Sequence, residues 1–254
     1  MNGTVSRRVF VGSVAAGIPL VVGGTRGALA QSPTTQAHAH PPTDGTPDAM
    51  FEHAITELAA LSTRIQRRGA TAEDVRLAAA HLGALAAYGQ QIDMDTPTRQ
   101  ATRDLIRTKG RDAVLAQDID TSRARARLKQ YGVNADERWF DTHKSDHDTR
   151  VKALDGFAQQ GITGLFAHLS STFERIGSTL DSHGGSVGAL RLVQLDEAWK
   201  AGFCAQLGKE IQRLEAEATI VCGIAWFYIS LEAVCAVTMI ALGIQMSVYV
   251  AYCR

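Results

Sequence analysis

The sequence predicts an all-α protein: a helical bundle with a long C-terminal helix that runs into an apolar, membrane-associated segment. Three observations support this fold class. Apolar residues recur at spacings of three and four, the period of an amphipathic helix, and the alternating pattern of a strand is absent. Alanine, leucine, glutamate, glutamine and arginine, which are good helix formers, dominate the chain beyond its N-terminal region. Only six prolines occur, and four of them lie within residues 33–47.

The first thirty residues have the features of a secretory signal. Arg7 and Arg8 give a positively charged start, an apolar run follows them, and Ala28 and Ala30 form an A-x-A cleavage site. An uncleaved membrane anchor is the alternative. The apolar run, however, contains several glycines and a proline, and it is shorter than the roughly 20 apolar residues that span a bilayer. We therefore expect residues 1–30 to be a cleaved signal peptide.

The same segment resembles a twin-arginine (Tat) signal, whose pattern is Ser-Arg-Arg-x-Phe followed by an apolar residue. These positions are Ser6, Arg7, Arg8, Phe10 and Val11, and Val11 stands where the family usually has leucine. The resemblance implies that the Tat translocase is a partner and that the chain folds before export. It also implies a location beyond the cytoplasmic membrane of a prokaryote, in the periplasm or at the outer face. The resemblance covers these thirty residues and none of the remaining chain.

Residues 31–48 are rich in proline, threonine and histidine and contain almost nothing that a core would bury. This composition predicts a disordered linker. The whole chain has 26 bases and 26 acids, and the signal carries three of the bases and no acid, so the mature chain has 23 bases against 26 acids. A slightly acidic balance gives no footprint for nucleic acid, and we expect no nucleic-acid partner.

Residues 49–217 are expected to form the helical bundle. Asp48 is a predicted N-cap, and apolar residues at helical spacing follow it until Arg-Arg-Gly at 67–69 closes the first helix. Thr71 and Asp74 form a near capping box, with aspartate in place of glutamate, that opens a second helix. The two helices predict a helical hairpin.

Weaker helical patterns follow around residues 98–108, 112–119 and 122–130. The strongest pattern lies in residues 162–180, where apolar residues step by 3, 4, 3 and 4, as in the seam of a packed bundle helix. The seam residues are Phe166, Leu169, Phe173, Ile176 and Leu180. A further long helix is expected to begin near Val187 and to continue without a breaker into the C-terminal tail.

The C-terminal segment, residues 218–254, is strongly apolar. Its only carboxylate is Glu232, and as a helix residues 233–253 would extend over about 31 Å, which is about the thickness of a hydrocarbon core. We expect membrane lipid as a partner, with residues near both ends of the segment in the membrane interface. These interface residues are Trp226, Tyr228, Glu232, Tyr249, Tyr252 and Arg254. A buried core helix and a helical hairpin are the open alternatives.

The four cysteines of the chain have a symmetric spacing of 18, 13 and 18 residues. An antiparallel hairpin centred near Tyr228 would align Cys204 with Cys253 and Cys222 with Cys235. Eighteen residues are five helical turns, so each helix would present its two cysteines on one face. An oxidising location beyond the membrane would allow disulfides. Four cysteines nevertheless permit three connectivities, and the residues around Tyr228 include no typical turn residue.

The best metal candidate is the pair His143 and His147. Their spacing of four places both on one face of a helix, and Asp141, Asp146 and Asp148 flank them, so the donor types suit a divalent metal. Two histidines make half a site, and no third ligand is identifiable. A solvated polar linker between helices is the alternative.

Residues 184–188 read Gly-Gly-Ser-Val-Gly, which matches the G-x-S-x-G pattern of a nucleophile elbow. Such an elbow follows a strand and needs a catalytic histidine later in the chain. Here the preceding residues are predicted to be helical, and no histidine follows His183. We therefore assign no catalytic residue and favour a protein that is not an enzyme.

Three functional hypotheses follow. The first is a Tat-exported, membrane-associated helical protein of the cell envelope with a binding or scaffolding role. The second is a precursor, in which residues 31 to about 198 are a leader or immunity-like domain and the apolar, Cys-containing tail is released as a membrane-active peptide. In the order of its segments this precursor is similar to Tat-exported halocin-type bacteriocin precursors, which also have an apolar, Cys-containing segment at the C-terminus. Those precursors carry many more cysteines. The third is a metal-binding protein or metalloenzyme that uses His143 and His147.

Overall fold

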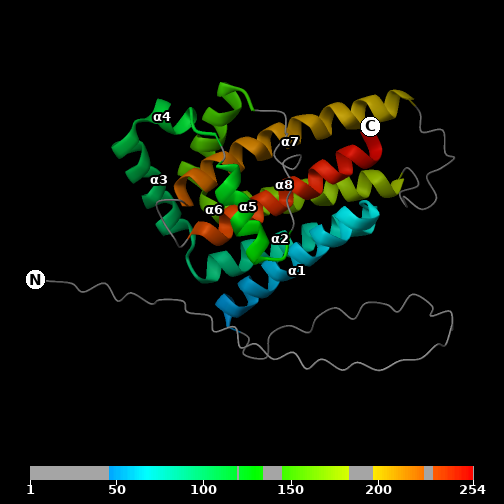
Figure 1. The fold of residues 1–254 in the computed structure, drawn as a ribbon, viewed down its shortest axis with the longest axis horizontal. Coiled ribbons are helices and arrows are strands. Elements are labelled where there is room, and N and C mark those ends of the chain that lie inside the picture. The colour runs from blue at the N-terminus through cyan, green and yellow to red at the C-terminus, as the bar shows by residue number, and fades with distance from the viewer. Residues whose placement is uncertain (1–45, 119, 134–144, 183–196, 226–230, 254) are drawn as a thin grey trace, which may run out of the picture. The chain divides into compact units, whose positions relative to one another are not determined.

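The computed structural model describes residues 46–118, 120–133, 145–182, 197–225 and 231–253. Within these ranges every regular element is a helix and no strand occurs, so the all-α prediction is confirmed (Figure 1). The helices are α1 (Pro47–Arg68), α2 (Ala72–Gln91), α3 (Asp95–Lys109), α4 (Arg111–Leu115), α5 (Thr121–Gln130), α6 (His147–Ser182), α7 (Glu197–Ala225) and α8 (Glu232–Cys253).

Helices α1 and α2 pack against each other, as the sequence predicts. The N-cap of α1 is Thr46 and not the predicted Asp48, because the Thr46 hydroxyl accepts a hydrogen bond from the amide of Ala49 at 3.3 Å. The predicted capping box of α2 is confirmed. The amide of Asp74 donates to the Thr71 hydroxyl at 3.1 Å, and the amide of Thr71 donates to the Asp74 carboxylate at 3.1 Å.

The longest helix, α6, is kinked at Gly161, whose φ is 71°. In an unbroken helix the amides of Ile162 and Thr163 would donate to carbonyls of the preceding turn. Here both donate to Oδ1 of Asp95, at 2.7 and 3.0 Å. Asp95 is the first residue of α3, so α3 supplies an N-cap for the second half of α6. The predicted seam of residues 162–180 follows this kink, and all five of its apolar side chains are buried.

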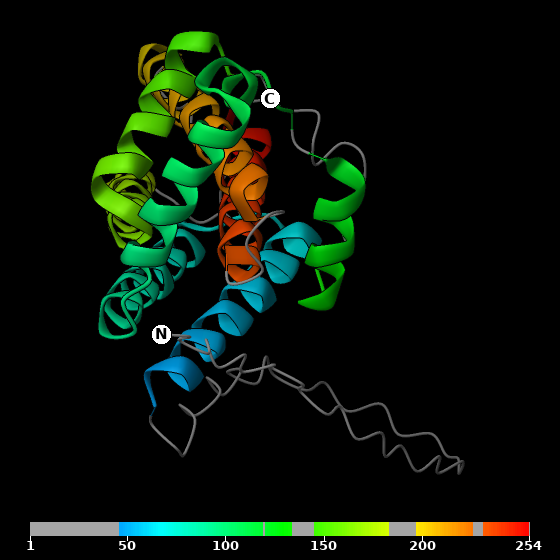
Figure 2. The ribbon, with the colours of Figure 1, turned by 90° about the vertical axis from the view of Figure 1, so that its left-hand side faces the viewer.

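Helices α7 and α8 form an antiparallel hairpin, which is one of the alternatives that the sequence left open. Helix α8 packs against α7, α1 and α5. Figure 2 shows α7 and α8 in the middle of the bundle, with α1 below them and α5 to one side. The apolar C-terminal segment therefore belongs to the same compact unit as the other described helices, and its start at residue 218 falls within α7.

Helix α8 confirms the predicted apolar C-terminal helix. It is the one helix in the described part of the chain that is long and apolar enough to cross a membrane, with a mean hydropathy of 1.9. In the bundle, 72% of this apolar stretch is buried. A core helix of a soluble protein can have the same length and composition. Helix α8 is thus a buried helix that also has the dimensions of a membrane span.

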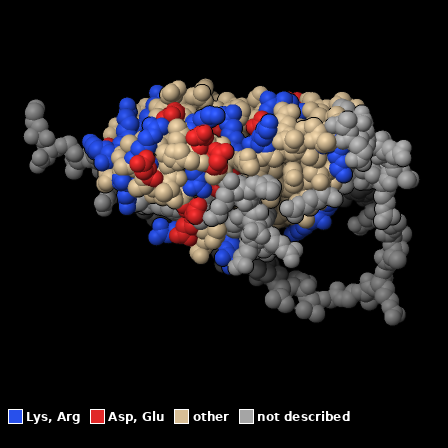
Figure 3. Space-filling model, turned by 90° about the horizontal axis from the view of Figure 1, so that it is seen from above, with Lys and Arg blue, Asp and Glu red and all other residues tan. Residues whose placement is uncertain are grey.

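Charged side chains are mixed on the face of the bundle that Figure 3 shows, where Lys and Arg lie among Asp and Glu. Several ion pairs connect neighbouring helices. Arg111 pairs with Asp155 at 2.6 Å, Arg175 pairs with Glu210 at 2.9 Å, and Arg76 pairs with Asp181. These pairs tie α6 to α4, α7 and α2.

Candidate functional site

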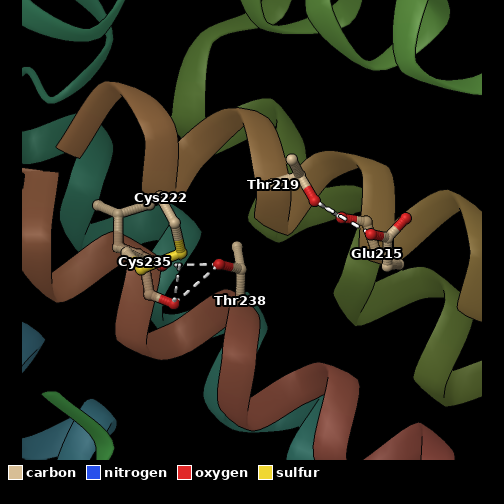
Figure 4. The surroundings of a disulfide bond; sticks show 6 residues. Glu215, Thr219, Cys222, Cys235 and Thr238 are labelled. Atoms are coloured by element: carbon tan, nitrogen blue, oxygen red, sulfur yellow. Dashed lines mark hydrogen bonds between the residues drawn. A yellow bond between two sulfur atoms is a disulfide. The ribbon is translucent and has the colours of Figure 1, made fainter. Parts of the chain in front are cut away.

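Two disulfides cross-link the α7–α8 hairpin. Cys204 is bonded to Cys253, with the Cα atoms 5.6 Å apart, and Cys222 is bonded to Cys235, with the Cα atoms 4.8 Å apart (Figure 4). This is the mirrored pairing that the symmetric spacing predicts. No cysteine is free. Both bonds join α7 to α8, so no disulfide connects the hairpin to helices α1–α6.

An aromatic cluster surrounds the Cys204–Cys253 end of the hairpin. The rings of Trp199 and Phe203 are stacked with centroids 5.3 Å apart, and Phe203 meets Tyr252 edge to face at 6.5 Å. The hydroxyl of Tyr252 donates to the carbonyl of Ala70 at 3.4 Å. This cluster packs the last turn of α8 against α7 and against the connection between α1 and α2.

The predicted membrane-interface residues fall at the ends of α8 where they are described. Glu232 is the first residue of α8 and forms an ion pair with Arg127 of α5. Tyr249 is partly buried and Tyr252 is buried in the last turns. The other three predicted interface residues lie outside the described residues; they are Trp226, Tyr228 and Arg254.

A buried charge cluster, which the sequence did not predict, joins α7 to the start of α6. Glu215 accepts a hydrogen bond from the amide of Ser145 at 2.8 Å, and its other carboxylate oxygen lies 3.9 Å from the guanidinium of Arg150. Thr219 donates to the same glutamate, as Figure 4 shows. Arg150 also donates to the carbonyls of residues 115 and 117. Buried charges are tolerated when they are paired and hydrogen-bonded in this way.

A second buried carboxylate on α7 has an altered proton affinity. Glu217 is 6% exposed and accepts a hydrogen bond from Nε of Arg213 at 3.0 Å. Burial raises the pKa of Glu217 to about 7, although Arg213 opposes the change. On α6, burial and the charge of Arg213 lower the pKa of His168. Both Glu217 and His168 line a groove between α6 and α7. Ionisable groups with shifted pKa values in such a groove indicate a candidate binding site.

The remaining predicted site residues are only partly described. His147 is the first residue of α6, and His143 lies outside the described residues, so the metal hypothesis stays a prediction. Within the described ranges no group of three or more His, Cys, Asp or Glu side chains could hold a metal ion. The Gly-Gly-Ser-Val-Gly stretch and the export-signal residues are also outside these ranges; the latter are Arg7, Arg8, Phe10, Ala28 and Ala30.

Comparisons with protein-family models, curated proteins and solved structures find no match to this chain. The hairpin and its surroundings therefore carry the functional interpretation.

Proposed function

We propose that this chain is an exported carrier for a membrane-active hairpin. In this proposal helices α1–α6 cover the apolar hairpin of α7 and α8 until it meets a membrane. The Tat-like signal would export the bundle after it has folded, with cleavage after Ala30. The observation that carries the proposal is the placement of both disulfides inside the hairpin.

The cross-links support separation because both lie within the hairpin and would keep its two helices together after release. A disulfide acts mainly by restricting the unfolded chain between its two cysteines. Both closed loops here lie within residues 204–253, so the restriction remains when the hairpin leaves the bundle. If the disulfides served to stabilise the whole bundle, a bond between the hairpin and α1–α6 would contribute more to its stability.

The dimensions of α8 suit a lipid environment. Its 22 residues extend over about 33 Å, close to the roughly 30 Å of a hydrocarbon core. Its polar contacts with α1–α6 lie near its ends, at Glu232 and Tyr252. Between them Gln245 is 1% exposed, and neither polar atom of its amide has a hydrogen-bond partner among the described residues. The Gln245 side chain therefore contributes no hydrogen bond that would hold α8 among the other described helices.

Dye-loaded lipid vesicles test this proposal. A specific protease site is placed within residues 183–196, between α6 and α7, in the oxidised mature protein. We expect the uncleaved protein to release little dye and the cleaved protein to release most of it, because cleavage frees the hairpin from its cover. Cleaved and reduced protein is the matched control and should release less. Cleaved, oxidised protein that leaves the vesicles intact would contradict the proposal.

Fractionation of the producing cells tests export and separates release from anchoring. We expect a C-terminal fragment outside the cytoplasm whose mass rises by about 4 Da on reduction, since two disulfides take up four hydrogens. Its companion should begin at Gln31. An intact chain that stays in the membrane fraction after a salt wash would replace release by permanent anchoring.

A further inference from the structure

A groove lies between α6 and α7, beside the kink of α6. Its volume is about 560 Å³, within the range of roughly 300–1,000 Å³ that is typical of small-molecule sites. The kink leaves the first half of α6 ending at this groove, and Gly161 lines it. Apolar side chains from α6 form part of the wall; they are Ala153, Phe157 and Leu165.

The charged side chains that line the groove leave it with an excess of positive charge. Lys152 of α6 and Lys209 of α7 line the groove and form no hydrogen bond or ion pair with the described residues. Arg213 donates a hydrogen bond from Nε to Glu217, and its two Nη groups have no partner among the described residues. The acids are already engaged, because Asp155 pairs with Arg111 at 2.6 Å and Glu217 is buried against Arg213.

The Arg213 guanidinium is fixed through Nε and remains accessible to solvent. Nε is fixed at 3.0 Å from a carboxylate that is 6% exposed, while about half of the arginine side chain remains accessible. A planar guanidinium with free Nη groups presents two parallel donors, which match the geometry of a carboxylate or a phosphate. Lys209 lies one turn before Arg213 on the same helix and adds a second charge on that side of the groove.

We propose that this groove binds a small amphiphilic organic anion. Arg213 and Lys209 would bind its oxyanion head, a carboxylate or a phosphate monoester, with Lys152 facing them from α6. The wall formed by Phe157 and Leu165 would contact its apolar body. This proposal does not rest on the membrane activity proposed for the hairpin, but the groove exists only while α7 packs against α6, before any release of the hairpin.

Isothermal titration calorimetry of the oxidised mature protein tests the site. The probes are 2-naphthoate and 2-naphthyl phosphate, with 2-naphthylmethanol and 2-naphthylmethylammonium as neutral and cationic matches. We expect saturable binding of at least one anion and none of the cation. Arg213→Met should weaken that binding about tenfold or more, and Lys209→Met should weaken it less, because the arginine alone offers a bidentate contact.

Arg107→Met on α3 is the matched control, since Arg107 lies outside the groove and pairs with Asp104. It should leave the affinity unchanged. Circular dichroism checks that every variant keeps the helical content of the wild type. Equal binding of anion and cation, or an unchanged affinity in the folded Arg213→Met variant, would overturn the proposal. A comparison of the two anions decides whether the head group is a carboxylate or a phosphate.

Discussion

Glu217 makes the stability of the bundle depend on pH. Its folded pKa of about 7 lies above the ordinary value of 4.5, so the folded protein binds this proton more tightly than the unfolded chain does. The stabilisation is fully present below pH 4.5 and is lost as the pH rises towards 7. The linkage amounts to about 3 kcal/mol in the free energy of unfolding. Glu217→Gln, which cannot ionise, should remove this component, and urea unfolding at a series of pH values measures it.

The control for this prediction is Glu174→Gln, which changes an exposed carboxylate on α6. The Glu174 variant should follow the wild-type pH profile, whereas the Glu217 variant should gain stability relative to wild type as the pH rises. A constant difference between wild type and Glu217→Gln across the pH range would contradict the prediction.

The sequence indicates some of these residues but not their environment. Arg213 and Glu217 are four apart, so their pairing on one helix face is readable from the sequence. The burial of Glu217 is not readable from the sequence, because it depends on how α7 packs in the folded bundle. The cluster of Arg150 and Glu215 joins residues 65 positions apart. A local sequence pattern cannot predict a contact between residues so far apart in the chain.

At the scale of single elements, the kink of α6 depends on one glycine. Gly161 has φ 71° and ψ −162°, a conformation that is essentially restricted to glycine, and a Cβ atom there would lie 2.3 Å from Oδ1 of Asp95. Gly161→Ala should therefore strain the backbone and displace the Asp95 cap, which lowers the free energy of unfolding by about 2–4 kcal/mol. Thermal and urea unfolding measure this loss.

Gly156 in the same helix offers a matched control. A Cβ atom at Gly156 would have no neighbour within 4 Å, so Gly156→Ala should be neutral or should stabilise α6 by up to about 1 kcal/mol. Equal effects of the two substitutions would show that the kink at Gly161 does not require glycine.

Helices with a clear apolar period could be predicted, and their irregularities could not. The seam at residues 162–180 and the capping box of α2 are local patterns, and both are confirmed. The kink depends on a cap from Asp95, which is 67 residues before Ile162. The hairpin has no turn signal at its centre in the sequence, and only the symmetric cysteine spacing indicates it. The symmetric cysteine spacing thus indicates the contact between α7 and α8, which the residues at the centre of the hairpin do not indicate.

At the scale of the whole molecule, the position of α8 determines how reduction of the two disulfides affects the stability of the bundle. Helix α8 packs against α1 and α5 as well as α7, so it is part of the core on which α1–α6 depend. Reduction of the two disulfides should cost about 3 kcal/mol or more by the loop-entropy relation. Because α8 is shared, that loss should lower the stability of the entire bundle and not of the hairpin alone.

Two probes of urea unfolding, with and without reductant, test this cooperative core. Far-ultraviolet circular dichroism reports all helices, and fluorescence reports the hairpin when Trp199 is the only tryptophan, after Trp139→Phe and Trp226→Phe. We expect both transitions to move together to lower urea on reduction. A chain with all four cysteines changed to alanine controls for direct effects of the reductant and should not respond to it. If only the fluorescence transition moves, the hairpin unfolds apart from α1–α6, as a peripheral anchor would, and α8 is not the shared core of the bundle.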